Sequence, residues 1–336
     1  MQPDIRRKFR YQLQGRQTGV AIVTALLLAA LAITLVMSLF GLQNVQVRSI
    51  ENQRFQLQKQ WVIRGALDWA RLILREDAKV TQVDYLGEPW SVPLEDTKLD
   101  QYVDNGLGSD DASEATLSGY ITDAQSRLNL TNLAANGVLV PTEVQAFERL
   151  LLALRMDSGL AVLTANMVAS TQEPVTQSPG AGGSDNGDGK ATTLTMTQVD
   201  DLLSIPGFTP ESIARLKELV VFLPIPTPIN VNTASAQVMS AKIPGISLSD
   251  AQQLVTSRDR AYFRSMTDFA ARWVYSNAAA PDSTVVNTQT NYFIVHGKVR
   301  LNRSALDVDA LIERTPVTGI TRVVWIRENN RKTLSV

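Results

Sequence analysis

His296 is the only histidine in the chain, so it is the one side chain that could serve as a general base near neutral pH. The sequence contains no cysteine, which excludes disulfides, thiolate metal sites and a cysteine nucleophile. No serine stands in a Gly-x-Ser-x-Gly motif. His296 itself ends the run 291–296, whose aromatic and β-branched residues are typical of a strand. We therefore expect His296 to have a structural role and the protein not to be an enzyme.

A second kind of chemistry, the removal of a leader peptide, is indicated at Gly19. This glycine separates a basic leader from an apolar segment that has no charged residue between positions 17 and 47. Residues 20–42 could cross the roughly 30 Å hydrocarbon layer as a helix, with the basic end in the cytoplasm. Prepilin peptidases cut after a glycine in such a position, which would make Val20 the first residue of the mature chain.

Two other interpretations of this segment stay open. A secretory signal peptide would be cut at the small residues of Ala30-Leu31-Ala32, and the chain would then begin with the apolar run at Ile33. A plain single-span anchor would leave Gly19 without a role. The chain beyond the membrane segment has to decide among the three.

The apolar segment continues into an amphipathic one. Apolar residues recur with a period near 3.6 over 62–74, and no proline interrupts the pattern. We expect one continuous helix from Val20 to about Glu76. Its second half, residues 43–77, should pack against a sheet of the same chain.

Several segments spread along the chain resemble one protein family. They are Gly87-Glu88-Pro89-Trp90, the Asp-x-Gln-x-Arg-Leu-Asn-Leu-x-Asn-Leu run at 123–133, Ile229-Asn230-Val231-Asn232-Thr233-Ala234, and the strand-like residues 292–301. Together with the leader and the Val-Ala-Ile-Val-Thr that follows it, they resemble, in order, the minor pseudopilin of type II secretion systems called general secretion pathway protein K. The resemblance implies an α+β fold in which a long N-terminal helix packs on an antiparallel sheet. It also implies a large all-α insertion of the helix-hairpin-helix or SAM-like type.

The distribution of strand signals predicts the same organisation. Such signals at 117–123, 290–302 and 322–327 flank a helical block, which implies an insertion. The Asn and Asp side chains of the run at 123–133 should hydrogen-bond the backbone of a turn. The predicted parts are a removed leader (1–19), a transmembrane helix (20–42), its amphipathic continuation (43–77), the first part of a pilin-like domain (78–132), an inserted helical domain (133–281) and closing strands (282–336).

Within the insertion, residues 141–168 are predicted to form one helix with Thr142 as its N-cap.

The Pro-, Gly- and Ser-rich residues 171–190 follow, and their composition predicts a flexible surface loop. Asp185 and Asp188 in this loop are the candidate calcium ligands, because the resemblance implies calcium near the insertion. Their spacing is not that of an EF-hand, since no Glu stands twelve positions into the loop. A solvated acidic loop is the alternative, and we expect no cofactor to be required.

Two Ile-Pro-Gly turns, at 205–207 and 243–245, raise a rival function, that of a membrane-anchored helix-hairpin-helix protein that binds DNA in competence. Such a module holds phosphate on free N–H groups at a glycine-rich helix start, with basic residues nearby. Here Thr209 and Ser247 stand where DNA binders carry a second glycine, and an acidic residue lies at the start of each following helix. A carboxylate there suits the helix dipole and repels phosphate, so we favour a structural scaffold.

The sequence thus predicts a structural subunit, a minor pseudopilin at the tip of the type II secretion pseudopilus that initiates or caps its assembly. The resemblance implies minor pseudopilins I and J, the major pseudopilin, prepilin peptidase and the inner-membrane secretion platform as partners. It also implies cleavage between Gly19 and Val20, N-methylation of Val20, and a single-pass inner-membrane protein whose C-terminal domain is periplasmic.

The fifth mature position is Thr24, where most pilins carry a Glu thought to pair with the N-terminus of a neighbouring subunit. An unpaired carboxylate in hydrocarbon is costly, so Glu is useful only where such a partner arrives. A neutral Thr can instead return its hydroxyl to a carbonyl one turn back. This residue is therefore expected in a subunit that enters the fibre first.

Overall fold

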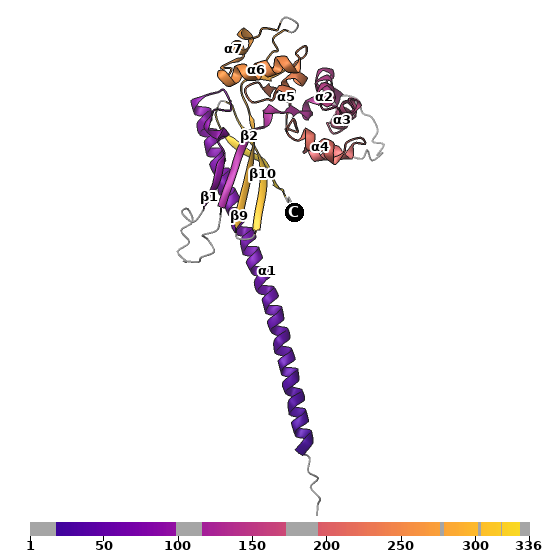
Figure 1. The fold of residues 1–336 in the computed structure, drawn as a ribbon, viewed down its shortest axis with the longest axis vertical. Helices are drawn as coiled ribbons and strands as arrows, with labels where there is room; N and C mark the ends of the chain where they lie inside the picture. Colours follow the sequence, from indigo (N-terminus) through magenta and orange to yellow (C-terminus); the bar gives the residue numbers. More distant parts are fainter. Residues whose placement is uncertain are drawn as a thin grey trace, which may run out of the picture. The chain divides into compact units, whose positions relative to one another are not determined.

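The computed structural model describes residues 18–98, 116–172, 194–275, 279–301, 304–316 and 318–329. The first element is one long helix, α1 (Thr18–Val80), which confirms the helix predicted from Val20 to about Glu76 (Figure 1). The chain forms two compact units, residues 1–60 and 61–336.

The second unit contains a five-stranded antiparallel sheet in the order β1-β2-β9-β10-β11. Figure 1 labels the first four of these strands. The last three strands follow one another in the sequence. By contrast, β2 pairs with β9 although 172 residues separate Thr122 from Ile294, so a large insertion leaves the sheet between these two strands. The strands are β1 (Leu94–Lys98), β2 (Thr116–Asp123), β9 (Tyr292–Leu301), β10 (Ser304–Arg314) and β11 (Thr321–Asn329).

The part of α1 that belongs to the second unit packs on one face of this sheet. Ile63, Leu67, Ala70 and Leu74 recur every three or four positions and are buried in one cluster with strand residues such as Phe293. Each large apolar side chain removed from water in this way contributes about 1.5–3 kcal/mol. The amphipathic pattern of the sequence predicted this packing.

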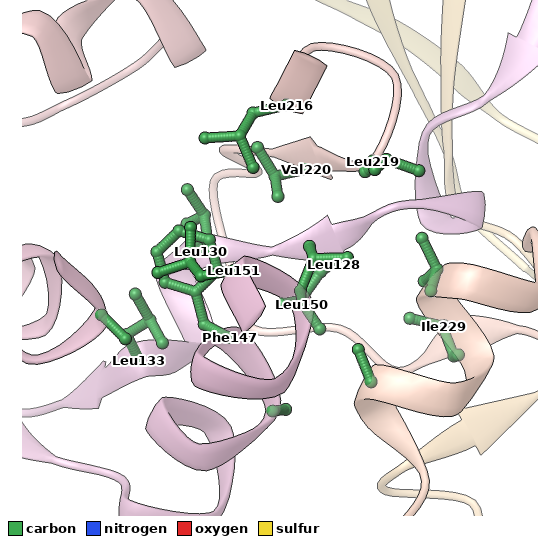
Figure 2. Packing of buried hydrophobic residues seen from close by; sticks show 14 of the residues in the cluster. Leu128, Leu130, Leu133, Phe147, Leu150, Leu151, Leu216, Leu219, Val220 and Ile229 are labelled. Carbon is green, nitrogen blue, oxygen red and sulfur yellow. The ribbon is translucent and has the colours of Figure 1, made fainter. Parts of the chain in front are cut away.

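The insert, residues 124–291, has its own apolar core, in which Leu130, Phe147 and Leu151 lie close together (Figure 2). Its α-helices are α2 (Pro141–Ala153), α3 (Gly159–Ser170), α4 (Pro210–Leu216), α5 (Ala236–Lys242), α6 (Leu248–Arg260) and α7 (Met266–Ala271). The 3-10 helices are η1 (Pro89–Ser91), which precedes the insert, and η3 (Ala124–Ser126), η4 (Leu130–Leu133) and η5 (Val199–Ser204) within it.

The insert also contains strands of two residues each, so it is not wholly helical. They form three pairs, β3 with β6, β4 with β5 and β7 with β8. Their bounds are β3 (Leu128–Asn129), β4 (Ala134–Ala135), β5 (Val138–Leu139), β6 (Val220–Val221), β7 (Ile229–Asn230) and β8 (Val286–Asn287).

The prediction of a single helix over 141–168 was wrong, since the structure has two helices, α2 and α3, in this range. Between them Arg155 adopts the left-handed conformation, with φ 56°, which a continuing helix does not allow. The predicted cap at Thr142 was also wrong. Pro141 occupies the first turn, where its missing N–H has no partner to lose, and Val140 takes the capping position.

Candidate functional site: the start of α1 and the sheet–insert junction

The residues expected to be processed lie in the first two turns of α1. Gly19, Val20 and Thr24 are exposed, and Gly19–Phe40 is long and apolar enough to cross a membrane, with a mean hydropathy of 2.8. A Cβ built at Gly19 would meet none of the described atoms within 4 Å, so packing within the chain does not require glycine here. The Thr24 hydroxyl donates to the carbonyl oxygens of Val20 and Ala21, each at 3.0 Å. This hydroxyl is therefore satisfied inside its own helix.

A proline-rich segment, residues 222–228, connects β6 to β7 in the insert. Pro224, Pro226 and Pro228 have no backbone N–H, so the segment cannot form a sheet ladder with a neighbouring strand. Its remaining N–H groups and its carbonyl oxygens still need hydrogen-bond partners where they are buried.

Side-chain amides of the run at 123–133 supply these partners. Asn129 accepts from the Leu223 N–H at 3.1 Å and donates to the Ile225 carbonyl at 2.9 Å. Asn132 accepts from the Thr227 N–H at 3.1 Å and donates to the Thr227 carbonyl at 2.8 Å. Both asparagines are buried. We call Asn129 and Asn132 the amide clamp.

The local turn predicted for this run is also present. Asp123 accepts from the Gln125 N–H at 2.7 Å, and Asn129 accepts from the Thr131 N–H at 3.1 Å. Gln125 further donates to the Pro228 carbonyl at 3.1 Å. The sequence indicated the turn, but it did not indicate that the same side chains hold a segment about a hundred positions away.

Another of the segments that resemble the family, residues 229–234, joins the insert to the sheet. The Asn230 side-chain amide donates to the Asp84 carbonyl at 3.0 Å and to a carboxylate oxygen of Asp123 at 2.9 Å. The Thr233 hydroxyl donates to the same Asp123 oxygen at 2.6 Å. Asp84 follows α1 and Asp123 ends β2, so one asparagine connects three parts of the fold.

Arg314, at the end of β10, completes this connection. It donates to Asp77 at 2.8 Å, to Asp84, and to the Thr290 carbonyl at 3.1 Å, and its guanidinium lies 4.6 Å from the centre of the Phe293 ring. Both ion pairs are buried. We call the following buried residues the junction: Asp77, Asp84, Glu88, Asp123, Asn230, Thr233, Thr290 and Arg314.

The carboxyl groups of the junction are less acidic than ordinary ones. Burial raises the pKa of Asp84 to about 7, the nearby charge of Asp123 adds to this effect, and Arg314 opposes it. Burial also raises the pKa of Asp77, of Glu88 and of Asp123, although each accepts hydrogen bonds that favour its ionised form.

Carboxylate oxygens of Asp77, Asp84 and Glu88 lie within 4.8 Å of one another, a spacing that a metal ion could use. Arg314, however, pairs with the first two, and Glu88 accepts from the indole N–H of Trp90 at 2.7 Å. A guanidinium thus takes the position that a cation would need, and we assign no metal to this cluster. The predicted calcium ligands, Asp185 and Asp188, lie outside the described residues.

His296 lies in β9, and its two neighbours belong to the adjacent strands. Its Nδ1 is 2.7 Å from Asp309 of β10, and its Nε2 is 3.2 Å from the Thr122 hydroxyl of β2. The Tyr120 ring stacks on the imidazole at 4.5 Å. The contact with Thr122 was not apparent from sequence spacing. All of these residues pair across the sheet, which agrees with the structural role expected for His296.

At both Ile-Pro-Gly turns a side-chain cap already occupies one N–H group of the helix that follows. Thr209 and Ser247 are N-caps whose hydroxyls accept from the amides of Ser212, at 3.2 Å, and Asp250, at 3.1 Å. Asp250 in turn accepts from the Ser247 N–H at 2.8 Å, and these hydrogen bonds hold the pKa of Asp250 below its usual range. An ionised carboxylate therefore stands where DNA would bring a phosphate.

Comparisons with known proteins support the family resemblance that the sequence indicated. Two family models described as type II secretion system protein K match residues 126–225 and 229–288. The type II secretion system protein K of Pseudomonas aeruginosa is 29% identical over 301 residues, which cover 85% of this chain and 85% of that protein. The Aeromonas hydrophila protein of the same name is 24% identical over 352 residues, which cover 94% of this chain and 97% of that protein.

The fold also occurs in a solved structure. A chain in the crystal structure of the GspK–GspI–GspJ complex from the type 2 secretion system of enterotoxigenic Escherichia coli matches with a TM-score of 0.63 and 20% identity. The match covers 84% of this chain and 99% of that chain, and the predicted α+β fold class is confirmed. The matched proteins are structural pseudopilins rather than enzymes, as the sequence predicted. Together, these comparisons support the predicted identification of this chain as a type II secretion system protein K, a minor pseudopilin.

Proposed function

We propose that this minor pseudopilin stands at the tip of the pseudopilus, where it initiates or caps assembly of the fibre. The observation that carries the proposal is the hydroxyl of Thr24, which donates to carbonyl oxygens of its own helix. A subunit inside the fibre would need a carboxylate at this position to meet the amino terminus of a neighbour. A subunit that enters first needs no such group.

Processing and location follow from the start of α1. Prepilin peptidase cleaves between Gly19 and Val20, and the new amino group of Val20 is methylated. Gly19–Phe40 then anchors the chain in the inner membrane by a single span, with the folded second unit in the periplasm. The open space around Gly19 supports this proposal, because the glycine has a use for a peptidase and none for packing.

The partners are minor pseudopilins of the I and J types. A structural relative of this chain is found in a complex of GspK, GspI and GspJ, which supports the assignment. The tip complex would then be joined to the major pseudopilin and extended from the inner-membrane secretion platform. DNA is not a partner in this proposal, since the helix starts at Thr209 and Ser247 are already capped.

Co-purification tests these partners. We expect the tagged full-length protein, extracted from membranes in detergent, to bring down the I and J pseudopilins of the same cells. A gel-shift assay with duplex DNA should show no salt-dependent complex. If the tagged protein were recovered without the I and J pseudopilins, and if it shifted DNA in a complex that weakens with salt, the rival DNA-binding function would be established instead.

A further inference from the structure

Four carboxyl groups and one guanidinium are buried together at the junction. The exposed fractions are 8% for Asp77, 1% for Asp84, 2% for Glu88, 2% for Asp123 and 4% for Arg314. If every group were ionised, four negative charges would face one positive charge in a site with little solvent. Such an excess of like charge away from water is costly, and groups in this situation retain protons instead.

Asp84 and Asp123 are joined through one residue of the junction, Thr290. Thr290 contacts both of them, because its N–H donates to Asp84 at 2.7 Å and its hydroxyl donates to Asp123 at 2.7 Å. Arg314 contacts Asp84 and Asp77, and no contact between Arg314 and Asp123 is present among the described residues. The carboxyl group of Asp123 is therefore balanced by neutral donors alone.

Several charged and titratable groups surround Asp84. Asp77 comes from α1, Tyr85 and Glu88 come from the segment around η1, Asp123 from β2, and Arg314 from β10. The segment after α6 contributes Tyr262, whose ring stacks on Tyr85 at 3.9 Å. Arg314 is the one cation among them.

We propose that the junction takes up a proton when it forms, held by the carboxyl pair Asp84 and Asp123, so that the attachment of the insert to the sheet weakens as pH rises. The proton is assigned to the pair rather than to one residue, because the charge of Asp123 raises the pKa of Asp84 and both carboxyl groups accept hydrogen bonds from Thr290. The insert is thereby held to the sheet more strongly in mildly acidic surroundings than at neutral pH.

The pH range follows from the two states of Asp84. Its pKa is about 7 in the folded protein, raised mainly by burial, against 3.8 for an exposed aspartate. Between about pH 4 and about pH 7 the folded junction holds a proton that the opened junction releases. The stabilisation is complete below this range, is lost as pH rises through it, and stays absent above it. At its steepest, the equilibrium for opening changes by about tenfold per pH unit.

Hydrogen exchange of the full-length protein in detergent tests the proposal at the junction itself. The amides of Asp84 and Thr290 are hydrogen-bonded within it, to the Thr288 carbonyl and to Asp84 respectively. After correction for intrinsic exchange, we expect their protection to fall between about pH 5 and about pH 7 by up to about tenfold per unit. In the variant Asp84→Asn this fall should be absent. Asp68→Asn, which removes an exposed carboxylate from α1, should behave like the wild type.

Two further measurements keep the test decisive. The infrared spectrum of the wild type should contain a protonated carboxyl band that disappears as pH rises through about 7, a readout that does not depend on any variant being folded. The exchange profile should also be the same with added calcium and with a chelator. The proposal would be overturned by a wild-type spectrum without this band, by an unchanged pH dependence in Asp84→Asn, or by protection that depends on calcium.

Discussion

At the scale of single residues, the structure depends on side chains that stand in for backbone partners. Prolines in residues 222–228 remove the N–H groups that a strand would use, and the amide clamp restores hydrogen bonds to the groups that remain. An amide side chain suits this role because it carries a donor and an acceptor together. The clamp therefore fixes the segment that leads into Asn230 and the junction.

Asn129→Ala is expected to destabilise the protein by about 3 kcal/mol, because it leaves the buried N–H of Leu223 and the carbonyl of Ile225 without their partners. The measurement is urea unfolding of the full-length protein in detergent. Gln252→Ala, which removes an exposed amide from α6, should change the free energy of unfolding by less than about 0.5 kcal/mol. Equal losses in the two variants would show that the clamp has no special role.

Thr24→Val is expected to leave secretion near the wild-type level, because the hydroxyl of Thr24 serves only its own helix. Thr34 provides a matched control, since its hydroxyl makes the same contacts with Ala30, at 3.0 Å, and Leu31, at 2.8 Å. The measurement is the amount of a secreted enzyme in the medium of complemented cells. If Thr24→Val abolished secretion and Thr34→Val did not, the Thr24 hydroxyl would have a partner in another subunit and the tip argument would fail.

Hydrogen bonds of single residues could be predicted from the sequence where both partners are near each other in the chain. The return of the Thr24 hydroxyl to Val20 and the turn that begins at Asp123 both follow from neighbours in the chain. It did not identify Arg314 or Asp84, because neither stands in a recognisable pattern. Their importance comes from burial and from partners in distant segments, which a single sequence does not show.

At the scale of elements, α1 was predictable because its signals agree along its whole length: an apolar segment, a stripe with a period near 3.6, and no proline. Strand β10 was missed. Its sequence, Ser-Ala-Leu-Asp-Val-Asp-Ala-Leu-Ile-Glu-Arg, is rich in good helix formers, yet it pairs with β9 on one side and β11 on the other. Tertiary pairing overrides local propensity in such a strand.

The mature protein is expected to begin at Val20. Mass spectrometry of the N-terminal peptide from membrane-extracted protein should find Val20 methylated. Gly19→Val should block cleavage. Gly65→Val is a matched control in the same helix, because a Cβ at Gly65 also meets nothing within 4 Å, and it should be processed normally. A chain that begins at Ile33 would favour a signal peptide and contradict the pilin-like processing.

Deleting residues 180–189 is expected to shift the melting temperature only slightly, because a Gly- and Ser-rich segment can bury little apolar surface. The measurement is thermal unfolding of the full-length protein and of the deletion variant, each with and without calcium. If calcium raised the melting temperature of the intact protein and not that of the deletion variant, Asp185 and Asp188 would be the calcium ligands.

At the scale of the whole molecule, strand signals on both sides of a helical block were enough to predict an insertion in the sheet. The structure adds how the insertion is held. Asn230 of the insert, Asp123 of β2, Asp84 after α1 and Arg314 of β10 meet at one buried place. These groups come from segments far apart in the sequence, and no local pattern relates them, so the junction could not be predicted from the sequence.

The tip assignment predicts the number of copies of this protein in a fibre. A subunit added first, with no carboxylate at Thr24 to receive a neighbour, should occur about once per pseudopilus, however long the fibre. The insert adds a second folded core beside the sheet, and this bulk would have to be accommodated at every repeat if the subunit were repeated along the fibre. Quantitative immunoblotting of sheared pseudopili, with the major subunit as the reference, measures the ratio. Lengthening the fibres by overproducing the major subunit should lower that ratio in proportion. Copy numbers that instead rise with fibre length would refute the tip assignment and place this protein along the shaft.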